Sequence, residues 1–77
     1  MNKILVNKTN LCIIEGETEI QCYSYSTLVG IYNKILNNYV LMDSYIDGGT
    51  KKPLSKTSRK HQNIFKREYI PANATEI

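Results

Sequence analysis

Alternation of side-chain polarity between residues 20 and 32 is the feature that most limits what this chain can fold into. The odd-numbered positions carry Tyr23, Tyr25, Thr27, Val29 and Ile31. The even-numbered positions carry Ser24, Ser26 and Gly30, with Leu28 and Tyr32 as apolar exceptions. A period of two is typical of a strand with one buried face and one face in water. The pattern predicts one long strand, with Leu28 and Tyr32 on its outer face as a contact surface.

Three shorter runs have the apolar, β-rich composition of strands. They are Met1–Val6, Leu11–Ile14 and Tyr39–Ile46. Gly16 allows a hairpin turn after the second run. Either Asn33-Lys34 or Asn37-Asn38 turns the chain before the last run, since asparagine tolerates the left-handed backbone of tight turns. Together these runs predict an antiparallel sheet of three to four strands.

One segment, residues 57–69, has helical periodicity. Thr57 or Ser58 can cap its first turn, and Pro71 disfavours helix at the residue before it. One side of the helix gathers His61, Ile64, Phe65, Glu68 and Tyr69. The opposite side gathers Arg59, Lys60, Asn63, Lys66 and Arg67. We therefore predict an amphipathic helix that packs on one face of the sheet and shows a basic face to water.

The length of the chain limits the fold to one small domain. A chain of 77 residues has a thin core, which leaves no room for an enclosed cofactor cavity. We predict a single α+β domain over residues 1–70 and a flexible tail, without partners, over residues 71–77. The expected packing set is Ile4, Val6, Ile13, Tyr23, Tyr25, Val29, Ile31, Leu41, His61, Ile64 and Phe65.

Charge divides the chain into two unequal parts. Residues 1–50 carry three cations against five carboxylates, which gives −2. Residues 51–77 carry seven cations against two carboxylates, which gives +5. The formal net charge of +3 therefore hides a basic C-terminal third, formed by the loop before the helix and by the helix itself.

The sequence predicts neither a metal centre nor an active site. Cys12 and Cys22 lack a CxxC spacing, and we expect two buried, inert thiols, with a cross-strand contact between them as the alternative. His61 lies on the predicted apolar helix face without a nucleophile or orienting group at a recognisable spacing. We expect His61 to pack against a strand, and we predict a protein that is not an enzyme and has no catalytic residue, metal or cofactor.

Two segments resemble a family of small, uncharacterised phage and mobile-element proteins. Ser24–Gly30 (SYSTLVG) is similar to the family's SYxTxVA strand, with Gly30 where alanine is usual. Ser55–His61 (SKTSRKH), followed by Phe65, is similar to its SxTTSxHxxxF helix start. The resemblance covers residues 22–69. It implies a phage-type accessory protein, a class that includes inhibitors of host defence such as anti-CRISPR proteins.

These observations predict a binding protein that inhibits a host defence system by blocking a protein or nucleoprotein surface. A CRISPR effector, with contact to its guide or target nucleic acid, is the most specific partner. The alternative is a nucleic-acid-binding accessory protein that uses the basic helix. The candidate binding residues are Lys51, Lys52, Lys56, Arg59, Lys60, Lys66, Arg67, Tyr32 and Leu28.

Two further expectations concern location and self-association. No apolar run approaches the ~20 residues that span a bilayer, and Lys3 is followed by only a short apolar run. We therefore expect no membrane partner and place the protein in the cytoplasm of the bacterial host. An exposed sheet edge allows strands of two copies to pair, so a homodimer is a further expectation.

Overall fold

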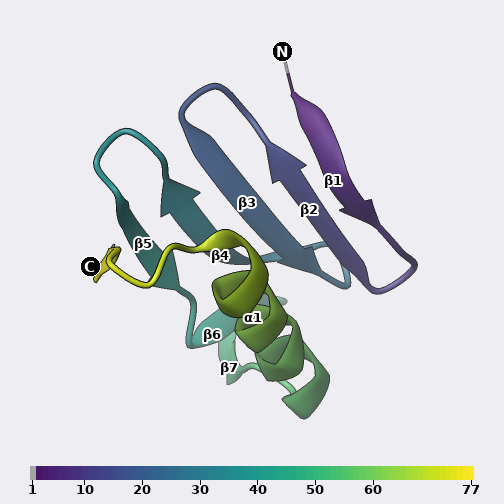
Figure 1. The fold of residues 1–77 in the computed structure, drawn as a ribbon. Coiled ribbons are helices and arrows are strands. Elements are labelled where there is room, and N and C mark those ends of the chain that lie inside the picture. Colours follow the sequence, from purple (N-terminus) through teal and green to yellow (C-terminus); the bar gives the residue numbers. More distant parts are fainter. Residues whose placement is uncertain (1) are drawn as a thin grey trace.

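The computed structural model describes residues 2–77 as a sheet with one helix across one face (Figure 1). Met1, the first residue of the first predicted strand, lies outside the described residues. The elements are β1 (Lys3–Asn7), β2 (Leu11–Glu15), β3 (Glu19–Ser24), β4 (Thr27–Asn33), β5 (Asn38–Leu41), β6 (Ser44–Asp47), β7 (Thr50–Pro53), α1 (Lys56–Tyr69) and β8 (Thr75–Glu76). The main sheet has the order β1-β2-β3-β4-β5-β8, and β6 and β7 form a separate hairpin.

The α+β class with a single C-terminal helix is confirmed, but the prediction of three to four strands is wrong. The main sheet of the described residues has six strands, all antiparallel except β8, which pairs parallel with β5. One strand is added because the strand predicted over residues 20–32 breaks at Tyr25-Ser26 into β3 and β4. Another is added because β8, at the end of the chain, pairs with β5. The strand predicted over residues 39–46 also breaks, after Leu41, but its second part leaves the main sheet for the β6–β7 hairpin.

The break at Tyr25-Ser26 changes which side chains face the helix. Both residues have positive φ, 51° and 66°, and they join β3 to β4 as a two-residue hairpin loop. The backbone twist of such a loop matches that of the flanking strands, which explains why two non-glycine residues adopt it. The pairing of β3 with β4 also shifts at Cys22/Tyr23, so a bulge follows the turn. A single unbroken alternation therefore does not describe this segment.

The predicted packing set is partly correct. Ile13, Val29 and Phe65 are fully buried, and Val6, Leu41 and Ile64 pack against the core from partly exposed positions. Four members are wrong. Tyr23 and Ile31 are half-buried on the face away from the helix, because the alternation of this segment was assigned to the wrong face. Tyr25 lies in the turn and is 52% exposed, and Ile4 is 59% exposed because a bulge in β1 puts it on the face opposite Val6. The inward positions of β3 are instead Ile20, Cys22 and Ser24.

The helix begins one residue earlier than predicted and ends where predicted. Ser55 is the N-cap, and its hydroxyl accepts a hydrogen bond from the Ser58 backbone N–H at 3.2 Å, so neither Thr57 nor Ser58 is the cap. Ile70 is the C-cap, directly before Pro71. Gln62 is buried beside Phe65 and donates from its amide to the carbonyls of Val29 and Met42, which fastens the helix to the strands below it.

The last residues of the chain have partners, which corrects the expectation of an unheld tail. The backbone N–H of Thr75 donates to the Asn37 carbonyl at 3.1 Å, and that of Ile77 donates to the Tyr39 carbonyl at 2.8 Å. The turn between β4 and β5 uses both candidate asparagine pairs. Asn33 accepts backbone hydrogen bonds from the turn, and Asn37 has a φ of 52°. The partners of the last residues were not predictable, because β8 pairs with β5 over only two residues and so leaves no periodic pattern in the sequence.

Gly30 lies under the helix at a point of close approach. A Cβ added there would lie 2.9 Å from the Phe65 ring, which is itself fully buried. Packing in the interior is dense, so neither the ring nor the strand can move without disturbing its neighbours. Glycine at position 30 therefore matches the packing of this chain, since any larger residue would meet the ring.

We predict that Gly30→Ala destabilises the fold by about 1–3 kcal/mol, the usual cost of overpacking a core. Chemical denaturation monitored by circular dichroism measures the change. Gly16→Ala is the matched control, because its Cβ would meet only the Asn2 side chain at 3.3 Å and one carbonyl at 3.6 Å. Equal stability of the Gly30→Ala variant and the wild type would contradict the proposed close contact.

Candidate functional site

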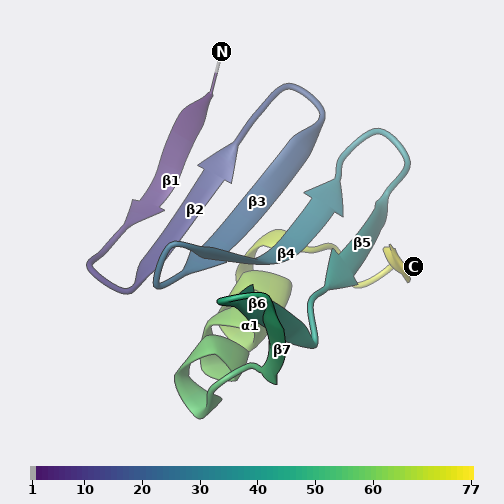
Figure 2. The same cartoon turned by 180° about the vertical axis from the view of Figure 1, so that it is seen from behind.

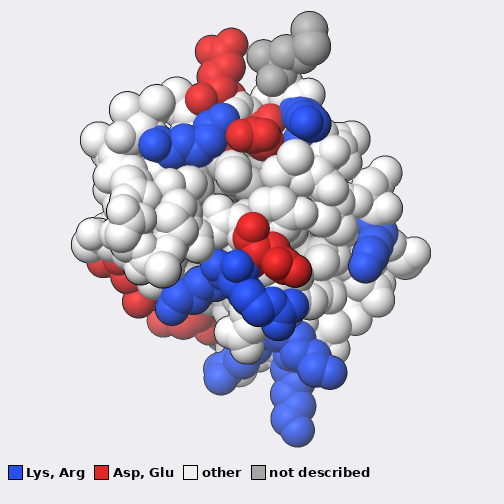
Figure 3. Space-filling model, viewed as in Figure 1, with Lys and Arg blue, Asp and Glu red and all other residues white. Residues whose placement is uncertain are grey.

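Five of the predicted cationic residues lie together on the exposed side of α1. They are Lys56, Arg59, Lys60, Lys66 and Arg67, and all are exposed. Their spacing along the helix follows its turn, so they line the side opposite the buried residues Ser58, Gln62 and Phe65. Figure 3 shows Lys and Arg side chains gathered over the helix on this side of the molecule. We call these five residues the basic helix face.

The two ends of the basic helix face have opposite effects on the stability of the helix. Lys66 and Arg67 lie in the last turn, where positive charge stabilises the helix dipole. Lys56 and Arg59 lie at the other end, where the dipole disfavours positive charge and no acidic residue offsets it. Within residues 2–77, no carboxylate lies within ion-pair distance of Lys56, Arg59 or Lys60. Helix stability therefore does not explain the cations of the first half.

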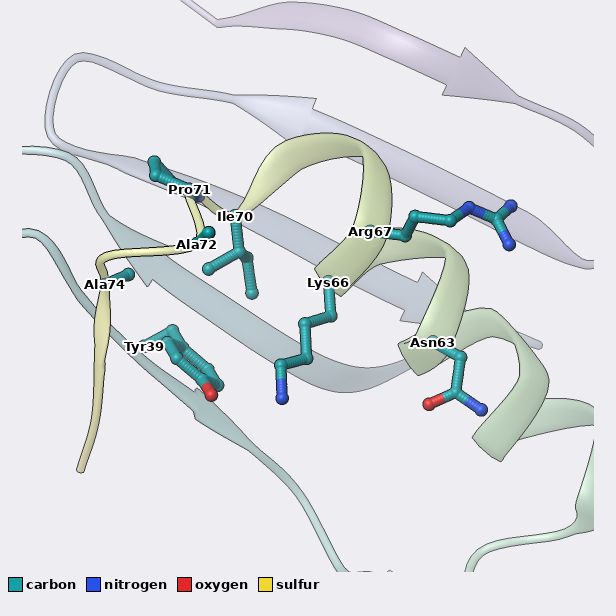
Figure 4. Close-up of a pocket in the computed structure, with 8 residues that line it drawn as sticks. All are labelled: Tyr39, Asn63, Lys66, Arg67, Ile70, Pro71, Ala72 and Ala74. Carbon is teal, nitrogen blue, oxygen red and sulfur yellow. The ribbon is translucent and has the colours of Figure 1, made fainter.

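A groove of about 450 Å³ lies between the second half of α1 and the segment that follows it. It is lined by Tyr39, Asn63, Lys66, Arg67, Ile70, Pro71, Ala72 and Ala74 (Figure 4). Lys66 reaches across the groove so that its ammonium lies 5.5 Å from the centre of the Tyr39 ring. The groove joins the basic helix face to an apolar wall and suits a ligand with both anionic and apolar parts.

The remaining predicted site residues lie elsewhere. Lys51 and Lys52 are exposed on β7, and Lys52 forms an ion pair of 3.0 Å with Asp47. Tyr32 is only 7% exposed, on the face under the helix, and its hydroxyl donates to Asn37 at 2.7 Å. The prediction of Tyr32 as a surface contact is therefore wrong, because the bulge in β4 puts Tyr32 and Leu28 on opposite faces of the sheet. Leu28 lies half-buried on the opposite face of the sheet.

The end of β3 and the start of α1 contact each other at the interface of sheet and helix. The Ser24 hydroxyl lies 3.0 Å from the Ser58 hydroxyl and 2.7 Å from Nδ1 of His61. Ser55 donates to Ser58 at 3.2 Å, so a chain of hydroxyls runs from the helix cap to the imidazole. This confirms that His61 packs against a neighbouring strand. Ser24 is 1% exposed, so the chain of hydroxyls holds sheet and helix together.

The environment of His61 also sets its charge. Burial lowers the pKa of His61 below 6.5, because the protonated ring loses hydration when it packs against the sheet. Well above pH 6.5 the ring is neutral in both the folded and the unfolded chain. As the pH falls below 6.5, the unfolded chain takes up the proton first, so this residue stabilises the fold less at acidic pH.

We predict that the stability advantage of wild type over His61→Gln shrinks as the pH falls from about 7.5 to about 5. Denaturant melts of both proteins at each pH measure the difference in unfolding free energy. The carboxylates titrate in both proteins and cancel in this difference. A difference that stays constant or grows at acidic pH would show that the folded imidazole does not resist protonation.

The two cysteines lie on opposite faces of the sheet, because Cys12 pairs with Tyr23 while Cys22 pairs with Ile13. Both are free, so the alternative of a cross-strand contact between their thiols finds no support. Cys22 is fully buried, and burial, with a smaller contribution from Cys12, raises the pKa of its thiol to about 12. Cys12 is half-buried on the face away from the helix, so the prediction of two buried thiols is correct only for Cys22.

The described part of the chain holds no group of three His, Cys, Asp or Glu side chains that could bind a metal ion. No helix within residues 2–77 has the length and apolar character needed to cross a membrane. Comparison with models of protein families, with curated proteins and with solved structures finds no match to this chain.

Sequence reasoning found the basic helix face but missed the residues around it. Tyr39 and Ala74 meet Lys66 only because β8 returns the chain to β5. Ser24 and Gln62 were missed as interface residues because a hydrophobic pattern treats polar side chains as exposed. Both make buried hydrogen bonds, which is how a polar side chain becomes part of a core.

Proposed function

We propose that this protein is a non-enzymatic, phage-type inhibitor that covers an anionic surface of a host defence nucleoprotein with its basic helix face. A CRISPR effector, contacted at its guide or target nucleic acid, is the most specific form of this proposal. The inhibitor acts in the cytoplasm of the bacterial host and needs no catalytic residue, metal or cofactor. Blockade is steric and electrostatic.

The observation that carries the proposal is the placement of Lys56, Arg59 and Lys60. They are exposed, no carboxylate within residues 2–77 neutralises them, and two of them lie where the helix dipole opposes their charge. An arrangement that weakens the helix is explained by a partner that supplies negative charge. Phosphate groups are such a partner, and arginine binds them with two parallel hydrogen bonds.

The family resemblance supplies the biological setting of the proposal. The residues behind it lie mostly at the interface of sheet and helix, so they support a shared fold more directly than a shared partner. The basic helix face is the part of this chain that points to the chemistry of the partner.

The alternative function, direct nucleic-acid binding as an accessory protein, uses the same residues. It is favoured by the groove, in which Lys66, Arg67 and Asn63 lie beside the apolar wall formed by Ile70 and Pro71. If all five cations contacted phosphates of duplex DNA, affinity would fall about 500-fold between about 50 and 200 mM salt. An inhibitor that also needs protein contacts would bind free nucleic acid weakly and with a smaller dependence on salt.

We predict that Arg59→Glu combined with Arg67→Glu abolishes inhibition of a CRISPR system in cells. The assay measures transformation by a plasmid that the system targets, which the wild-type protein should restore. Reversing two charges in the basic helix face replaces attraction to phosphate with repulsion. Circular dichroism of the double variant verifies its fold.

Lys3→Glu combined with Lys8→Glu is the matched control, since it changes the net charge equally but at exposed positions on β1 and in the loop after it. The control should inhibit like the wild type. Loss of inhibition in both double variants would mean that net charge alone matters. Steep, salt-dependent binding of random DNA without any inhibition would favour the accessory-protein alternative.

A further inference from the structure

The face of the sheet opposite α1 is apolar although nothing in the described chain covers it. Figure 2 shows β1 to β5 from this side, with the helix behind them and the β6–β7 hairpin below their ends. Cross-strand pairing places one row on this face: Ile4, Ile14, Gln21, Ile31 and Val40. A second row consists of Cys12, Tyr23 and Leu28, with the exposed Asn7 beside Cys12 at its end. We call the eight residues of the two rows, without Asn7, the open face.

The open face is separate from the hydrophobic core. None of its apolar residues belongs to the core cluster or to the partly buried side chains that pack against that cluster. An antiparallel sheet with one face in water normally alternates apolar residues inside with polar residues outside. Seven of the eight side chains in the two rows are apolar, aromatic or thiol-bearing, and the polar outward residues Asn7, Glu19, Asn33 and Asn38 lie around them. Solvent exposure does not explain an apolar patch of this size at the centre of the face.

The polar groups of the open face are already satisfied within the chain. The Tyr23 hydroxyl donates to the Gln21 side chain at 2.8 Å, and the Gln21 amide donates to Glu19 at 3.3 Å. Covering Gln21 and Tyr23 therefore leaves neither side chain without a hydrogen-bond partner, which lowers the cost of removing water. A partner needs no matching polar group at the centre of this face.

Charge favours a second copy of this chain as the covering partner. The open face carries no cation and no carboxylate within its two rows, and Glu19 lies only at their margin. Nucleic acid or an acidic protein would find nothing to pair with there. Two copies related by a two-fold axis would bring neutral faces together and leave both basic helix faces pointing outward, which avoids repulsion between them.

We propose that two copies of this chain pack open face to open face and form a two-layered sheet sandwich with a helix on each outer side. Five strands about 4.8 Å apart and about 17 Å long give each face a flat, projected area of roughly 400 Å². Two such faces total about 800 Å², which is below the ~1,200–2,000 Å² of stable specific interfaces and in the range of weak, transient ones. The dimer is therefore weak and concentration-dependent, and it depends on stacking of sheets, unlike a dimer formed by pairing of edge strands.

Sedimentation velocity of the full chain from about 10 μM to about 1 mM tests the proposal. The wild type should shift from monomer to dimer within this range. Ile31→Lys, at the centre of the open face, should remain a monomer. Ile46→Lys is the matched control, because Ile46 is 69% exposed on β6, outside the open face, and this variant should dimerise like the wild type. If Ile31→Lys does not fold, Ile4→Lys replaces it at a position that is already 59% exposed.

Cys12 gives a second readout on the wild-type protein. It is the accessible thiol of the pair, since Cys22 is fully buried with a pKa of about 12. In the sandwich, its modification by a maleimide should slow several-fold at the high end of the concentration range, and Cys12→Ser should not react in the folded state. A wild type that stays monomeric throughout, an Ile31→Lys or Ile4→Lys variant that still dimerises, or a Cys12 rate independent of concentration would overturn the proposal.

Discussion

The ring of Phe65 occupies the space that a side chain at position 30 would need, and the rest of the fold depends on this contact. It brings the helix close enough to the sheet for Gln62 to reach the carbonyls of Val29 and Met42. It also brings Ser58 and His61 within hydrogen-bond distance of Ser24. A small protein has little core to spare, so one apolar contact and a few buried hydrogen bonds must fix the helix on the sheet.

Fixing the helix in this way divides the molecule into two surfaces of different character. The outer side of the helix carries five cations, and the far side of the sheet carries uncharged, mostly apolar residues. The two proposals follow this division. The basic helix face is suited to phosphate groups, whereas the open face is suited to an uncharged surface like itself. A face-to-face dimer would present two basic helix faces and would strengthen attachment to an extended anionic partner through multivalency.

The predictions from the sequence agreed best with the structure where they rested on patterns between residues close together in the chain. The helix at residues 56–69, its end before Pro71 and the packing of His61 against a strand were predictable, because capping, proline geometry and helical periodicity act over a few residues. The basic helix face was predictable for the same reason. The strand at residues 20–32 was not, since two residues with positive φ break it and a bulge then shifts its register. Each event reverses the inward and outward faces of the residues that follow.

By itself, the sequence determined the α+β class, the single C-terminal helix and the gathering of positive charge on one side of that helix, since these follow from composition and periodicity. Only the tertiary structure decided that Tyr32 is buried, that Tyr23 and Ile31 belong to an uncovered face and that Tyr39 joins Lys66 in a groove. The physical reason is that turns, bulges and the parallel pairing of β8 depend on contacts between residues far apart in the chain. Such contacts leave no periodic pattern in the sequence.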